Sequence, residues 1–190
     1  MKFPIEYEKY KQIPPDCPIY DKNNPDYRCS VDYDKTNYRK NKAIEEHKKE
    51  KVEISKISKL IEDFLKPTNI ESECIVLKGI DILLAVNYEI IKRQYNLNNQ
   101  SDLVWLRFTD DGYLGVVASS NDINFDQNTN SFKLINHIKQ KWDENLILIV
   151  PLPGIYNKDE RVEIEKMIGN YLIEKKVPII DYYSHMSFAL

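Results

Sequence analysis

Serine, aspartate and histidine residues lie at the ends of apolar segments in the second half of the chain, where a hydrolytic site would need them. Ser119 and Ser120 follow one apolar segment, and Asp181 and His185 follow the last one. A serine hydrolase combines a serine nucleophile with a histidine base and a carboxylate that orients the histidine. Ser119 or Ser120, with His185 and Asp181, is therefore a candidate catalytic set. Because Asp181 and His185 share one strand end and need not face one another, both also fit ordinary surface positions.

A ligand cleft is expected in the same region. In an open parallel sheet, ligands bind outside the carboxyl ends of the strands, where backbone groups and helix N-termini converge. The expected segments are 78–81, 119–122, 151–156 and 181–185. Their polar residues are Asp81, Ser119, Ser120, Asn121, Asp122, Tyr156, Asp181, Ser184 and His185.

The last third of the chain contains the clearest structural signal. The segments LILIVPLPG at 146–154 and VPIID at 177–181 have the composition of buried strands. Between them, Asn157 and Glu160 resemble a capping box that opens a helix extending to about residue 176. Two strands of one sheet that are joined by a crossover helix usually form a parallel unit with a right-handed connection. We therefore expect these two strands to be parallel.

Periodicity predicts further elements before this unit. Residues 43–66 carry an apolar stripe at helical spacing, with Asn41 as the expected N-cap and Pro67 as the stop. Residues 74–79 are short, apolar and β-branched, which is typical of a strand. Residues 80–95 show both alternation and a helical face, and the length of the run favours a helix.

A hairpin is expected next. The segments 103–108 and 113–118 flank the sequence TDDG, which is a turn signal. Asp110 and Asp111 are adjacent carboxylates, but turn chemistry explains their position without a metal or an acid–base role. Apolar residues at helical spacing over 132–142 predict another amphipathic helix.

Residues 1–42 differ from the rest, since they hold six of the 13 tyrosines and five of the nine prolines. The prolines favour extended or turn conformations, so this segment is interpreted as an arm. Its tyrosines are expected either to pack on the protein itself or to contact a partner protein. The tyrosines concerned are Tyr7, Tyr10, Tyr20, Tyr27, Tyr33 and Tyr38.

Composition excludes several classes of function. Acidic and basic residues are mixed along a chain with a net charge of −3, so nucleic acid is not an expected partner. No leader pattern and no apolar run of about 18 residues is present, which predicts a cytoplasmic protein without membrane contact. Irregular spacing favours free thiols over disulfides or a zinc site of Cys17, Cys29 and His47. With five glycines and no phosphate-binding loop, no cofactor is expected.

The order of segments from 113 to 181 resembles the later portion of the SGNH, or GDSL-type, hydrolase family. The resemblance rests on YLGVVASSND, a helix, LILIVPLPG, and a helix followed by VPIID. In that family an Asn in a Gly-x-Asn-Asp block helps to form the oxyanion hole, and the resemblance transfers this role to Asn121. Ser119 replaces the glycine, CIVLKGID at 74–81 offers no serine nucleophile, and DYYSH at 181–185 lacks the Asp-x-x-His spacing. The resemblance therefore implies the fold and a ligand cleft, with the catalytic machinery lost.

We therefore expect a single α/β domain at 43–190, with a three-layer, mainly parallel sheet of flavodoxin-like or SGNH-like type, after the arm at 1–42 and a long helix. The expected function is non-catalytic binding of another protein, as an inhibitor, immunity or regulatory protein. The incomplete catalytic sets and the aromatic arm favour this function. The alternative is a hydrolase that acts on a small ester, glycan or nucleotide in the cleft, with Asn121, Asp181 and His185 as catalytic residues.

Overall fold

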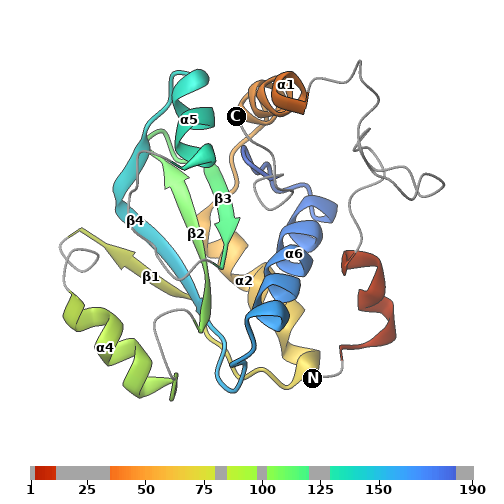
Figure 1. Ribbon diagram of the computed structural model, residues 1–190, viewed down its shortest axis with the longest axis vertical. Helices are drawn as coiled ribbons and strands as arrows, with labels where there is room; N and C mark the ends of the chain where they lie inside the picture. The colour runs from red at the N-terminus through yellow and green to blue at the C-terminus, as the bar shows by residue number, and fades with distance from the viewer. Residues whose placement is uncertain (1–2, 12–34, 80–84, 98–101, 120–128, 183–190) are drawn as a thin grey trace.

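The computed structural model describes residues 3–11, 35–79, 85–97, 102–119 and 129–182, which form one sheet with helices on both of its faces (Figure 1). The strands are β1 (Ile75–Lys78), β2 (Leu103–Thr109), β3 (Leu114–Ala118) and β4 (Trp142–Pro151). The helices are the 3-10 helices η1 (Ile5–Lys11) and η2 (Lys66–Thr68), with α1 (Lys35–His47), α2 (Ile54–Leu65), α4 (Ala85–Gln94), α5 (Asn130–His137) and α6 (Lys158–Glu174). None of these described helices has the length and apolar character that crossing a bilayer requires.

The sheet has the strand order β1-β4-β2-β3, and every neighbouring pair is antiparallel. The sequence-based prediction of a mainly parallel sheet of flavodoxin-like or SGNH-like type is therefore wrong. That prediction relied on strands that are apolar on both faces, which is typical of parallel sheets covered by helices. Here helices cover both faces of an antiparallel sheet, and all seven residues of β2 are buried. The same apolar pattern therefore arises without parallel crossovers.

Alternate residues of the central strands supply two hydrophobic cores. Val104 and Leu106 of β2 pack in a core with apolar residues of α2 and α6. Leu103 and Trp105 pack in a second core with residues of α4 and α5. Successive side chains of a strand point to opposite faces, so these cores lie on opposite sides of the sheet.

The segment at 177–181 runs beside β3 rather than forming a full strand. It makes a single parallel bridge, between Ile179 and Leu114. Pro178 has no backbone N–H, which limits the ladder that this segment can form. Since β3 and β4 both run antiparallel to β2, the segment is parallel to β4 as expected, but its neighbour is β3.

The helix predicted over 43–66 is two helices. α1 and α2 are separated by residues 48–53, hereafter the strap, and Asn41 lies inside α1 rather than at an N-cap. α1 also begins within the segment that was interpreted as an arm. Glu53, which precedes α2, has an extended backbone with φ −64° and ψ 142°. Contacts of the strap with the β2–β3 turn, described below, hold this break, and such contacts leave no trace in local periodicity.

The helix predicted over 132–142 is also shorter than expected. α5 ends at His137, and Trp142 belongs to β4. Trp142 packs across Gly115 of β3, where a Cβ would lie 2.1 Å from the Trp142 ring. The missing side chain at Gly115 therefore provides the space in which the indole is buried against the sheet.

Other local predictions are confirmed. β1 lies within 74–79, α4 lies within 80–95, and β2 and β3 form the expected hairpin. The Asn157 side chain caps α6, because it accepts hydrogen bonds from the backbone N–H groups of Asp159 and Glu160. The sequence signals of these elements are carried by residues close to one another in the chain.

Candidate functional site

Asp181, predicted as a catalytic carboxylate, is engaged in a buried ion pair. Arg39 of α1 donates from Nη2 to both carboxylate oxygens, at 2.7 and 2.8 Å. The two side chains are 1% and 0% exposed. Asn121 and His185, which were predicted to act with Asp181, lie outside the described residues. The observed contact of Asp181 ties α1 to the segment beside β3.

Ser119, predicted to line the cleft, is buried at the end of β3, and its hydroxyl donates to Glu165 of α6. Burial raises the pKa of Glu165 to about 7, against the lowering effect of the Ser119 hydrogen bond. Tyr156 is 50% exposed between β4 and α6. The remaining predicted cleft residues lie outside the part of the chain that the structure describes. They are Asp81, Ser120, Asp122 and Ser184.

Because the sheet is antiparallel, the carboxyl ends of its strands do not all lie on the same side. The carboxyl ends of β3 and β4 lie at one end of the sheet, whereas those of β1 and β2 lie at the opposite end. The backbone N–H of Asp181 donates to Gly115 near the start of β3, while Ser119 follows the end of that strand. Ser119 and Asp181 are therefore held at opposite ends of β3 by different partners.

The described tyrosines of the N-terminal segment pack on the protein itself. Tyr7 stacks on Phe64 of α2 with ring centroids 4.5 Å apart, and its hydroxyl donates to the Phe64 carbonyl at 2.8 Å. Tyr10 is 6% exposed and meets Tyr171 of α6 edge-on at 5.5 Å. Tyr38 of α1 is half-buried against the same core. Tyr20, Tyr27 and Tyr33 lie outside the described residues.

A lysine-rich cavity lies where α2, the strap and the C-terminal end of α6 meet. Its volume is about 530 Å³. Five lysines and two acidic residues line it, an excess of three positive charges on a chain whose net charge is −3. The lining residues, hereafter the lysine groove, are Glu50, Lys51, Val52, Lys56, Lys59, Leu60, Asp63, Lys175, Lys176 and Val177.

α2 supplies one wall of the lysine groove. The wall residues recur at positions i, i+3, i+4 and i+7, so they share one face of the helix. A second face of α2, with Ile57, Ile61 and Phe64, is buried in the core and fixes the orientation of the helix. The wall residues are Lys56, Lys59, Leu60 and Asp63.

The C-terminal end of α6 supplies a second wall. The backbone N–H of Val177 donates to Leu172 and that of Lys176 to Ile173, each at 2.9 Å, which forms a Schellman motif. Lys176 accordingly has a left-handed backbone with φ 65°. Glycine is preferred at such a position, because a Cβ in this conformation costs about 1–2 kcal/mol. Lysine nevertheless occupies it, with its side chain exposed in the groove.

Four lysines of the groove have no ion-pair partner among the described residues. Ion pairs elsewhere in that part of the chain engage other lysines, such as Lys9 with Glu174 and Lys49 with Glu46. One of the four groove lysines, Lys175, lies over the Tyr171 ring, with its Nζ 5.2 Å from the ring centre. The excess of ammonium groups around one cavity raises the local positive potential and attracts anionic groups. The four are Lys56, Lys59, Lys175 and Lys176.

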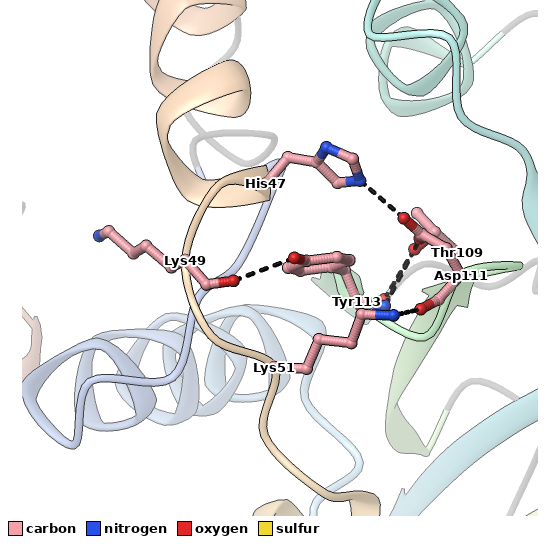
Figure 2. A network of polar contacts seen from close by, with 6 residues as sticks. All are labelled: His47, Lys49, Lys51, Thr109, Asp111 and Tyr113. Atoms are coloured by element: carbon pink, nitrogen blue, oxygen red, sulfur yellow. Dashed lines mark hydrogen bonds and ion pairs between the residues drawn. The ribbon is translucent and has the colours of Figure 1, made fainter.

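A polar network fixes the strap to the β2–β3 turn (Figure 2). His47 Nε2 lies 2.8 Å from Asp111 Oδ2, and the Tyr113 hydroxyl donates to the Lys49 carbonyl at 3.0 Å. Lys51 Nζ donates to the Asp111 carbonyl and lies 5.1 Å from the centre of the Tyr113 ring. The network therefore holds the strap, and with it one wall of the lysine groove.

The carboxylate of Asp111 is satisfied within this network. Burial raises its pKa, but the hydrogen bonds from the Thr109 hydroxyl at 2.5 Å and from His47 outweigh burial, so the net pKa is lowered. The carboxylate thus stays ionised at neutral pH as the anchor of the strap. As predicted, Asp111 belongs to the hairpin turn.

The lysine groove was not identified from the sequence. Lys56 and Lys59 lie within the helix that the sequence predicted over 43–66, where their spacing places them one helical turn apart and indicates nothing more. Lys175 and Lys176 are more than 100 residues away in the chain. Only the packing of α6 against α2 brings the two pairs of lysines together.

No group of three or more metal-ligating side chains comes together within the described ranges. The chain matches no protein-family model, no curated protein and no solved structure at a level that indicates relationship. The function has to be inferred from the residues of the groove and their surroundings.

Proposed function

We propose that this protein binds a partner protein by holding an acidic segment of the partner in the lysine groove. The observation that carries the proposal is the convergence, around one cavity of about 530 Å³, of four lysines that make no ion pair with another described residue. An acidic segment supplies the carboxylates that complement these ammonium groups. Lysines placed on a helix and on a capped helix end approach such a segment from two sides.

The expected energies define the kind of binding. An exposed lysine–carboxylate pair contributes about 0.2–1 kcal/mol, so three or four such pairs supply roughly 1–4 kcal/mol. Salt screens contacts of this kind, and complementary charge acts mainly on the association rate and on the choice of partner. Binding at the groove should therefore weaken as the ionic strength rises.

The surroundings of the predicted catalytic residues support binding rather than turnover. Both carboxylate oxygens of Asp181 accept hydrogen bonds from Arg39, and the Ser119 hydroxyl donates to Glu165. In this proposal the protein acts by occupying its partner, as inhibitors, immunity proteins and regulatory subunits do. Contacts of the partner with the remaining tyrosines of residues 1–42 stay a prediction.

A random-peptide display library, selected against the full chain at low ionic strength, tests the proposal. We expect the enriched peptides to be rich in Asp and Glu and to be released by added salt. The variant Lys56→Glu/Lys59→Glu should lose these peptides. The control, Lys133→Glu/Lys139→Glu, makes the same change in net charge at exposed positions outside the groove and should retain them.

Two results would overturn the proposal. One is a selection that shows no enrichment of acidic residues over the unselected library. The other is equal binding of the enriched peptides to the two charge-reversal variants, with both folded by circular dichroism.

A further inference from the structure

The floor of the lysine groove is aliphatic. Val177 is 3% exposed, and Val52 and Leu60 are half-buried against the main core. The alkyl stems of the surrounding lysines extend this apolar surface, because lysine keeps only its ammonium group in water. The groove therefore combines an apolar floor with a positively charged rim.

We propose that the segment held in the groove carries an aliphatic or aromatic side chain flanked by acidic residues. The apolar side chain covers Leu60, Val52 and Val177, while the carboxylates reach the lysines of the rim. This inference rests on the proposed function and specifies which acidic segments the groove accepts.

An apolar side chain is expected in the bound segment because ion pairs and apolar burial contribute differently to binding. The rim lysines are all exposed, so their pairs with carboxylates are screened by salt and distinguish poorly among polyanions. Burial of one leucine-sized side chain is independent of charge and strengthens binding by roughly tenfold to a hundredfold. A small inorganic anion cannot cover the apolar floor, so its binding lacks this contribution to affinity.

Asp63 affects where the carboxylates of the bound segment can lie in the groove. It lies one helical turn after Leu60 on the same wall, whereas Lys56 and Lys59 precede Leu60. A carboxylate placed beside Asp63 would be repelled. Asp63 therefore limits where along the α2 wall the carboxylates of the bound segment can lie, and favours contacts with Lys56 and Lys59.

Synthetic peptides test the inference without altering the protein. A fluorescein-labelled Glu-rich peptide with one central Leu is compared with the same peptide carrying Ser, by fluorescence anisotropy with the full chain. We expect the Leu peptide to bind at least about tenfold more tightly. The variant Leu60→Ala should reduce this ratio, whereas Leu60→Met should preserve it.

The outcomes separate this inference from the proposed function. Equal binding of the Leu and Ser peptides overturns the apolar anchor but leaves the acidic-segment function in place. No binding of either peptide overturns the function itself. Inorganic tripolyphosphate that binds as tightly as the Leu peptide identifies a small-anion site and overturns the inference. Because the peptide pair is compared on the unaltered chain, the test does not depend on the folding of any variant.

Discussion

Two lysines in equivalent conformations allow the contribution of the groove to be separated from that of net charge. Lys176 follows α6 with φ 65°, and Lys139 follows α5 with φ 61°. Both are exposed, and the same pair of hydrogen bonds ends each helix. Only Lys176 lines the lysine groove. Lys176→Gly and Lys139→Gly therefore remove the same charge and the same backbone strain, but only one alters the groove.

Both variants should be more stable than the original chain. Glycine relieves a left-handed conformation that costs about 1–2 kcal/mol with a Cβ. It also gives the unfolded chain more freedom, which offsets about 0.4–1 kcal/mol. The net gain is roughly 0.5–1 kcal/mol. For a protein of this size, such a gain raises Tm by about 1–4 °C.

Binding should distinguish the two variants. Loss of one exposed lysine–carboxylate pair costs about 0.2–1 kcal/mol, so Lys176→Gly should weaken the acidic Leu peptide by roughly 1.5- to 5-fold. Lys139→Gly should leave its Kd unchanged. Thermal unfolding and fluorescence anisotropy on the same samples provide both readouts.

The binding measurement and the thermal unfolding measurement can each contradict the reasoning. Equal weakening by the two substitutions would show that net charge, and not the groove, determines affinity. A Tm that falls in both variants would refute the argument from the left-handed backbone.

Further predictions concern the buried and paired carboxyl groups. Because the pKa of Glu165 is raised from 4.5 to about 7, folding stability is lost as the pH rises through this window. Glu165→Gln should therefore increase the free energy of unfolding in urea by up to about 3 kcal/mol at about pH 8, with little effect at about pH 4. The lowered pKa of Asp111 has the opposite sign, so the stability lost in Asp111→Asn at neutral pH should vanish in thermal scans as the pH falls below the ordinary 3.8. Asp181→Asn removes the carboxylate charge that pairs with the buried Arg39 and should cost about 3–5 kcal/mol in urea unfolding, whereas Arg39→Met/Asp181→Leu should cost less.

The sequence by itself was sufficient for elements whose signals are local. The cap of α6 at Asn157, the turn that contains Asp111 and the strand at 74–79 all have sequence signals carried by residues within a few positions of one another. Burial of β4 on both faces at residues 147–150 was also evident from the continuous apolar character of that segment. The relative direction of the strands was not evident from the sequence, because antiparallel strands covered by helices on both faces have the same apolar pattern as parallel ones.

Tertiary packing decided the rest. The break between α1 and α2 depends on the contact of the strap with Tyr113, and the strand conformation of Trp142 depends on the space at Gly115. Asp181 was identified as a functional candidate from its type and position, but its partner Arg39 is 142 positions away in the chain. Contacts of this kind have no periodicity and cannot be inferred from spacing.

The candidate site illustrates the same division. The sequence placed Lys56 and Lys59 one helical turn apart within the predicted helix 43–66, and Lys175 and Lys176 at the expected end of the last helix. It did not determine that Lys175 and Lys176 would face them across an aliphatic floor. That arrangement follows from the burial of α2 and α6 in one core, because the energy of packing their apolar faces fixes where their polar faces meet.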